Sequence, residues 1–248
     1  MERTLGQSPD RRRRGPRQGW LSSFDGVFYR LGILTGTLAQ DFNENGNQYN
    51  GGLSLYAPFN QRFELLFNIP FIVSNREPSG SDYKTNFGDV QITTRFLISE
   101  SRNFTQSFNV AFRIPSGSDV NGNGFAAVTP DWEFWWNIWC KLVLRGGVGF
   151  AIPYTDTDRT RDAILGNLAI GYYFTPHDFI PLGDLVWYVA ANVNQPVDNG
   201  SKEPGVTLTP GFRTHLGRNW YLLGGIELPV TDPVPFNFQV LAGLMKVF

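Results

Sequence analysis

Cysteine, histidine and long apolar runs are nearly absent from this 248-residue chain. Cys140 is the one cysteine, so no disulfide can form within the chain. The two histidines, His177 and His215, leave little material for a transition-metal site, and we expect no metal and no cofactor. No window of about 18 uncharged apolar residues occurs, which argues against a membrane-spanning helix.

Charge is also scarce, at 17% of the residues against roughly 25% in soluble domains. Aromatic residues, by contrast, reach 15%, and glycine occurs 27 times. This composition suits strands that face lipid on one side and a crowded interior on the other. The mean hydropathy of -0.21 is what averaging an apolar face with a polar face gives, and it differs from that of a helical membrane protein.

The N-terminus is basic. Its first 20 residues carry six arginines against one glutamate and one aspartate, a local charge of +4 in a chain of net charge -1. A secretory signal would continue into a long apolar stretch, but Gly15, Pro16 and Arg17 follow the arginines. We therefore expect residues 1–22 to form a disordered basic segment, with the export signal missing or replaced. Four consecutive arginines also fit a nucleic-acid-binding arm; we expect no nucleic-acid partner.

Apolar and polar residues alternate through the rest of the chain. Phe63, Leu65 and Phe67 share one parity, and Glu64 and Asn68 take the other. Successive side chains of a strand point to opposite faces, so each such segment predicts an amphipathic strand. The segments are 63–71, 89–98, 107–114, 131–138, 142–152, 164–174, 185–194, 207–216, 220–228 and 236–244, with two weaker ones near 27–41 and 49–58.

The connections between these segments alternate in length. Short ones lie at 60–61, 99–103, 140–141 and 217–219, and long ones, rich in Gly, Asn, Asp and Ser, lie at 74–86, 115–127, 154–162 and 195–205. Periplasmic turns and extracellular loops produce this rhythm in outer-membrane barrels. Two connections depart from it, because 175–184 is long on the short side and 231–235 is short for a loop.

Together these patterns predict an all-β fold, a single transmembrane up-and-down antiparallel β-barrel of about twelve strands over residues 23–248. We expect it in the bacterial outer membrane, with outer-membrane lipid against its apolar face and both termini periplasmic. A soluble β-protein also alternates and is the competing interpretation. The apolar parity continues over nearly the 9–11 residues that a membrane strand needs, which favours the barrel.

The last predicted strand ends in an aromatic residue, Phe248. A terminal aromatic resembles the signal by which outer-membrane barrels are recognised for assembly, so we expect the barrel assembly machinery to be a partner through Phe248. Lys246 stands where an apolar or aromatic residue is more usual. A lysine near the membrane interface can extend its amine to water, which reconciles it with this interpretation.

Several short glycine- and proline-based pieces resemble a family of outer-membrane barrels described as transporters of a phenol meta-degradation pathway. The pieces are ELLFNIP at 64–70, FGDV at 87–90 followed by Arg95-Phe96, FRIPSG at 112–117, TPGF at 209–212 and GGIELPV at 224–230. They cover the chain from about residue 50 to the C-terminus. The resemblance implies a barrel and, less specifically, transport.

Charged residues gather on the inward parity. Lumen-lining or selectivity candidates are Glu64, Asp89, Arg95, Arg113, Glu133, Arg145, Arg213 and Glu227, with Asp131 and His215 on the same face. An arginine or lysine facing lipid at the midplane would cost about 2–4 kcal/mol, so an inward position is expected. Two interpretations remain open: a polar conduit that selects solutes, and a salt-bridged interior, which the near balance of acids and arginines favours. Twelve strands lie between filled barrels of about eight and open ones of sixteen or more.

Two further features, a loop and a group of tryptophans, are weaker. Residues 119–124 match the first half of a calcium loop, but Pro130 stands where the required glutamate would be, so a plain Asx/Gly loop is expected. Trp132 and Trp136 fit an aromatic girdle, whereas Trp135 and Trp139 have the inward parity, where they could stack on an aromatic solute or only fill the lumen.

Neither histidine has a serine or acid partner suggested by spacing, and no G-x-S-x-G occurs. We expect no catalytic residues and no enzyme. The sequence therefore predicts a barrel that lets small solutes pass, aromatic or hydrophobic compounds among them. The alternative is a closed structural or surface-binding barrel that transports nothing.

Overall fold

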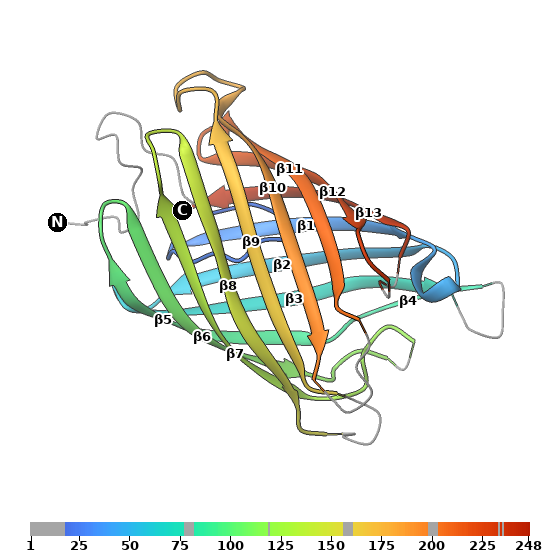
Figure 1. Cartoon of the computed structure of the whole chain (residues 1–248). Helices are drawn as coiled ribbons and strands as arrows, with labels where there is room; N and C mark the ends of the chain where they lie inside the picture. The colour runs from blue at the N-terminus through green and yellow to red at the C-terminus, as the bar shows by residue number, and fades with distance from the viewer. Residues whose placement is uncertain are drawn as a thin grey trace.

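A single antiparallel sheet closes on itself in the computed structural model (Figure 1), which describes residues 18–76, 82–118, 120–155, 161–197, 203–232, 234 and 236–248. The strands are β1 (Leu31–Gln40), β2 (Gln48–Pro58), β3 (Phe63–Arg76), β4 (Tyr83–Asn86), β5 (Val90–Glu100), β6 (Phe104–Ile114), β7 (Ala127–Asn137), β8 (Leu142–Pro153), β9 (Ala163–Tyr173), β10 (Gly183–Pro196), β11 (Gly205–Gly217), β12 (Trp220–Pro229) and β13 (Phe238–Val247).

Twelve of these strands form the wall. Neighbours in sequence pair in turn, β2 pairs with β3, and β1 pairs with β13, so the described wall has no free edge. The short β4 pairs with the end of β3 and extends a loop beyond the wall. The predicted twelve-stranded up-and-down antiparallel barrel is confirmed. A 3-10 turn occurs at Phe42–Glu44, and no helix in the described ranges is long and apolar enough to cross a membrane.

The predicted parities hold along the wall, as β7 illustrates. Trp132 and Trp136 face outward with 36% and 44% of their surface exposed, while Trp135 between them is buried in the interior. The strand ends at Asn137, so Trp139 lies in the following turn and is 75% exposed. The expected inward position of Trp139 is therefore wrong, because the alternation stops where the strand does.

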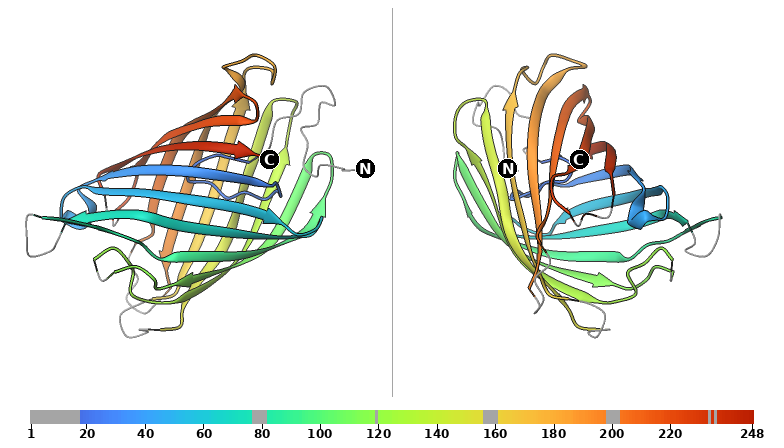
Figure 2. Two further views of the ribbon diagram at one scale, coloured as in Figure 1. Left: turned by 180° about the vertical axis from the view of Figure 1, so that it is seen from behind. Right: turned by 45° about the vertical axis from the view of Figure 1, so that its right-hand side comes forward.

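The two ends of the barrel differ. Connections 59–62, 101–103, 138–141 and 218–219 lie at one end, together with the longer 174–182 and the C-terminus; we call this the short-turn end (Figures 1 and 2). The remaining connections lie at the long-loop end. The loop predicted at 74–86 is shorter than expected, because β3 continues to Arg76 and pairs with β4.

The first strand begins later than predicted. It was expected near residue 27, but β1 starts at Leu31. The described residues before it do not join the sheet and run inside the barrel (Figure 2, dark blue). Their buried members include Gln18, Trp20 and Phe28. The basic residues 1–17 lie outside the described residues.

Candidate functional site

The barrel interior holds a stretch of the chain itself, residues 18–29, which we call the luminal segment. It contacts Arg213 in the short-turn half of the wall, reaches its apex near Ser22, and returns to Glu64 at the start of β3. The Nε2 of Gln18 donates to the carbonyl of Val27 at 2.6 Å, which ties the two arms of this loop together. Most of its other polar contacts are made to the barrel wall.

Arg145 on β8 is the wall residue that contacts the segment most closely. Its guanidinium forms an ion pair with Asp25, and its Nε donates to the carbonyl of Phe24 at 2.5 Å. The same guanidinium lies 5.0 Å from the ring centroid of Trp20, a cation–π distance. Arg145 is fully buried, and its cross-strand neighbours Trp135 and Ala169 carry no charge. The carboxylate in direct contact with it is that of Asp25, from the segment.

Arg95 on β5 anchors the returning arm. It forms an ion pair with Glu64, its direct cross-strand neighbour, and a second with Glu133 at 3.3 Å. It also donates to the carbonyls of Asp25 and Val27, the latter at 3.4 Å. A buried charge needs a counter-charge and acceptors for its N–H groups. The two carboxylates and the two carbonyls supply both to Arg95.

The starting arm is held by Arg213 on β11, whose Nη1 donates to the carbonyl of Gln18 at 2.5 Å. Its guanidinium also lies 5.6 Å from the ring of Tyr173 and 5.2 Å from the ring of Tyr221. Three of the four predicted inward arginines, Arg95, Arg145 and Arg213, thus bind backbone carbonyls of one segment.

Amides and carboxylates of the wall bind the apex. Asn167 Oδ1 accepts from the backbone N–H of Phe24 at 3.1 Å, and Glu227 Oε2 accepts from the hydroxyl of Ser22 at 3.1 Å. Tyr188 accepts from the N–H of Leu21 at 2.8 Å. All three bonds use wall side chains and none of them belongs to a strand ladder.

Apolar contacts also fix the starting arm. The ring of Trp20 stacks on Tyr188 with centroids 4.8 Å apart and planes 5° from parallel. Both belong to a buried cluster with Trp135 and Val27. The aromatic rings bury area that would otherwise face water in the lumen.

Above the apex, toward the long-loop end, the lumen is hollow. This cavity of about 440 Å³, which we call the vestibule, has Ser23, Phe24 and Asp25 among its lining residues. Arg113 lines it with its guanidinium 5.3 Å from the ring of Phe125. Asp131 lines it too, and its carboxylate accepts from Asn109 at 2.6 Å.

The eight predicted lumen candidates divide into three places. Around the luminal segment lie Glu64, Arg95, Glu133, Arg145, Arg213 and Glu227. Arg113 lies in the vestibule. Asp89 lies among the loops, where it accepts from the N–H groups of Gly117 at 3.0 Å and Asn123 at 2.7 Å. A selectivity role for the eight stays a prediction.

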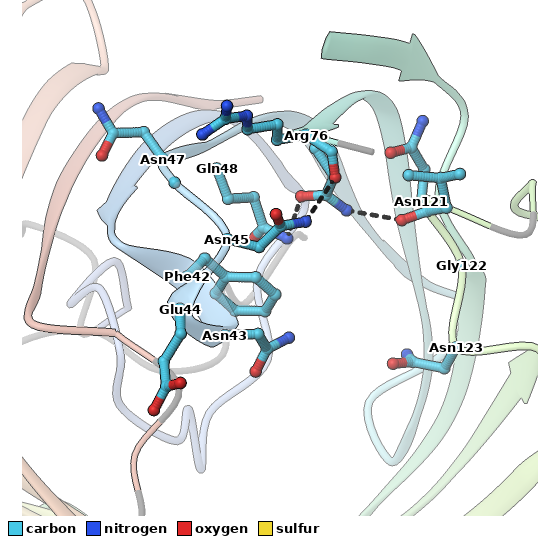
Figure 3. A pocket seen from close by; sticks show the side chains of 13 residues that line it. Phe42, Asn43, Glu44, Asn45, Asn47, Gln48, Arg76, Asn121, Gly122 and Asn123 are labelled. Atoms are coloured by element: carbon cyan, nitrogen blue, oxygen red, sulfur yellow. Dashed lines mark hydrogen bonds between the residues drawn. The ribbon is translucent and has the colours of Figure 1, made fainter. Parts of the chain in front are cut away.

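A second hollow opens at the rim of the long-loop end, and we call it the rim cup (Figure 3). It measures about 610 Å³ and is lined mainly by amides from three segments, 42–48, 75–76 and 120–123. Asn75 donates to the carbonyl of Val120 at 2.8 Å, and Asn45 donates to that of Arg76 at 2.9 Å. The ring of Phe42 lies among these amides.

The histidines meet at the short-turn end. His177 Nδ1 lies 2.6 Å from Asp184 Oδ2, and the ring of His215 stacks on His177 at 4.2 Å. The sequence spacing did not suggest this acid partner, because it comes from the far side of the 174–182 connection. No group of three or more His, Cys, Asp or Glu that could hold a metal occurs in the described ranges, and Asp119 of the half calcium motif lies outside them.

Sequence reasoning missed the luminal residues Gln18, Trp20 and Asp25. They form no periodic pattern, since they belong to neither a strand nor a helix. One indirect signal existed: once the register is known, Arg145 and Arg213 have only uncharged cross-strand neighbours, whereas Arg95 has Glu64. A buried arginine that faces no charged residue across either neighbouring strand points to acceptors supplied from elsewhere.

An amphipathic closed wall, an outward apolar face and a polar interior define an outer-membrane, porin-like β-barrel. The pattern of the family described as "Putative MetA-pathway of phenol degradation" matches residues 30–235, so the chain belongs to that family. No curated protein sequence matches the chain.

Solved structures share the architecture. The COG4313 outer membrane channel from Pseudomonas putida F1 is 12% identical, with 93% of this chain and 99% of that chain covered and a TM-score of 0.67. The NanC porin is 10% identical, with 88% and 99% covered and a TM-score of 0.59. The KdgM porin is 13% identical, with the same coverage and a TM-score of 0.57. At these identities the likeness establishes the fold.

Proposed function

We propose that the barrel lets small solutes, aromatic or hydrophobic compounds among them, cross the outer membrane through its lumen when the luminal segment moves aside. The observation that carries the proposal is that the barrel wall and the luminal segment are held in place by different interactions. The wall closes through its own strand ladders, while the segment is attached by side-chain bonds and packing. The vestibule gives a solute about 440 Å³ of space next to the segment.

The fold relatives support a solute-holding lumen. A KdgM porin of this architecture has been solved in complex with disordered oligogalacturonate. In this chain the polar groups nearest the segment are arginines, carboxylates and amides, which can bind solute hydroxyl and carboxylate groups. Passage without covalent chemistry needs no nucleophile, so the proposal assigns no catalytic residue.

A disulfide that locks the segment tests the proposal. In a Cys140→Ser background, Ser23→Cys with Asn167→Cys is designed to join the apex to β9, because the Ser23 hydroxyl faces Asn167 and lies 3.3 Å from its Oδ1. Uptake of sugars, amino acids and phenolic compounds into liposomes is then compared before and after reduction. We expect uptake only after reduction. Equal uptake in both states would show that the segment does not block the path.

A surface-binding barrel without transport is the second candidate, and the rim cup favours it. Seven amide side chains line that cup, at the long-loop end of the barrel. Folded protein that gives no uptake above empty liposomes, in the locked and reduced states alike, would support this second function and reject passage.

A further inference from the structure

We infer that the luminal segment occupies a binding site for an aromatic carboxylate on the barrel wall, and that such a solute displaces the segment. The inference rests on the proposed function and names the solute class. It begins at Arg145, whose guanidinium receives two groups from the segment: the carboxylate of Asp25 and the indole ring of Trp20. A ring and a carboxylate presented together are what an aromatic acid such as benzoate carries in one molecule.

The wall supplies a matched partner for each group. The phenol ring of Tyr188 stacks face to face on Trp20, and the buried Trp135 belongs to the same cluster. The guanidinium of Arg145 faces both groups, and an arginine recognises a carboxylate best when two N–H groups bind its two oxygens. These three wall residues would bind a ring and a carboxylate without the segment.

The segment uses this site incompletely. Asp25 bonds one terminal nitrogen of Arg145, Nη2, whereas Nη1 is buried without an acceptor in the described structure. The indole N–H of Trp20 is also buried without an acceptor there. A buried donor without a partner weakens the state that contains it. A free carboxylate can rotate to satisfy both nitrogens of Arg145, so it can compete with a segment whose backbone is tied at both arms.

The vestibule is the remaining candidate for the same solute, but it matches less well. Arg113 and the ring of Phe125 face it, yet the carboxylates of Asp131 and Glu133 line it as well. An anion would meet like charges there. The observations therefore favour Arg145, and the test separates the two places.

Exposure of a buried residue of the segment reports displacement. Val27 is 1% exposed, so Val27→Cys in a Cys140→Ser background should react with a membrane-impermeant maleimide only when the segment leaves. We expect benzoate to accelerate labelling saturably, by about fivefold or more, whereas acetate, which lacks the ring, and benzyl alcohol, which lacks the charge, do not.

Substitutions test whether benzoate acts at Arg145. Arg145→Gln combined with Asp25→Asn removes the charged pair as a unit, leaves no uncompensated buried charge, and should abolish the benzoate effect. Arg62→Gln, an exposed arginine of a short turn, is the matched control and should retain it. Asp25→Asn alone weakens the competitor and should lower the benzoate concentration at half-maximal labelling.

Three results would overturn the inference. The first is labelling unchanged by benzoate. The second is an effect that survives in the Arg145→Gln/Asp25→Asn variant, and the third is one that is lost in Arg113→Gln instead. Any of them can occur while the reduced disulfide variant still takes up solutes, so a wrong binding site is distinguishable from a wrong function. Saturable labelling with no uptake would conversely retain the site and reject passage.

Discussion

Gly171 on β9 lies directly under the indole of Trp20, where a side chain has no room. A Cβ there would lie 2.8 Å from Trp20 Cζ2 and 3.0 Å from Tyr188 Cβ. The indole belongs to the segment and can move, whereas Tyr188 belongs to the wall. A single methyl group at this position should therefore push the segment out and leave the barrel closed.

We expect Gly171→Ala to raise maleimide labelling of Val27→Cys without any solute, by roughly fivefold or more, since about 1 kcal/mol of overpacking suffices for that change. Gly166→Ala on the same strand is the control, because its Cβ would meet only Val193 Cβ at an ordinary 3.6 Å. Equal labelling in the two variants would mean that Trp20 does not hold the segment in place.

Glu64 differs from Asp25 because its partner, Arg95, belongs to the wall. Both are buried and adjacent across the β3–β5 ladder, and Glu64 also accepts from the N–H of Tyr29 at 3.1 Å. Glu64→Gln leaves Arg95 in an ion pair with Glu133, at 3.3 Å. Breaking a buried pair by neutralising one member costs about 3–5 kcal/mol.

The free energy of unfolding of Glu64→Gln should thus fall by about 3 kcal/mol, at the lower end of that range because Glu133 remains. Urea titration of the barrel folded in phospholipid vesicles measures it. Glu100→Gln, an exposed position at the end of β5, should change the value by less than about 0.5 kcal/mol. A similar loss in both variants would contradict a special role for the buried pair.

At the scale of whole elements, the wall could be predicted from sequence because each strand has lipid on one side. The requirement for an apolar outer face makes β5 place Phe96 and Ile98 outward while Thr93 and Arg95 point inward. The same parity predicted Glu64 as luminal. The ends of strands were less certain, since a strand such as β3 can continue beyond the membrane and pair with a loop strand.

The luminal segment could not be predicted in the same way. Wall arginines hold it by binding its backbone carbonyls. Every residue has a carbonyl, so these contacts do not require a particular side chain in the segment. Such contacts leave no periodicity in the sequence of residues 18–29. The wall half of the site was therefore predicted at Arg95, Arg145 and Arg213, while the half contributed by Trp20 and Asp25 was found only in the structure.

The closing strand β13 carries a prediction of its own. It completes the ladder with β1, and Phe248 follows it, 72% exposed, with its N–H bonded to the carbonyl of Arg30 at 3.0 Å. Lys246 reaches the carbonyl of Arg218 at 2.6 Å and lies 5.1 Å from the ring of Trp220, so its amine extends along the short-turn end as expected.

Removal of Phe248 should therefore slow assembly in cells and leave the folded barrel intact, because the ring makes little contact with the wall. The heat-modifiable folded form in isolated outer membranes measures assembly. Phe179→Ser, an aromatic 56% exposed at the same end, is the control. Normal assembly without Phe248 would contradict recognition through the terminal aromatic residue.

The whole molecule combines a nearly neutral wall with one charged insertion. Inward charges of the wall are Glu64, Asp131, Glu133 and Glu227 against Arg95, Arg113, Arg145 and Arg213. The luminal segment adds Asp25, which lies against Arg145. When the segment leaves, that carboxylate leaves with it, and Arg145 joins Arg213 among the charges that an ion meets in the short-turn half of the lumen.

The open barrel should therefore select weakly between ions, and Arg145→Gln should shift it toward cations. A unit charge about 4 Å from an ion contributes about 1 kcal/mol in water, which corresponds to a change of about fivefold or more in the anion-to-cation permeability ratio. The reversal potential under a KCl gradient, measured in the Gly171→Ala background, reports that ratio. Arg62→Gln, on an exposed turn, should leave it unchanged. An identical reversal potential in Arg145→Gln would place the ion path away from Arg145, and the luminal segment would then fill a part of the barrel that solutes do not use.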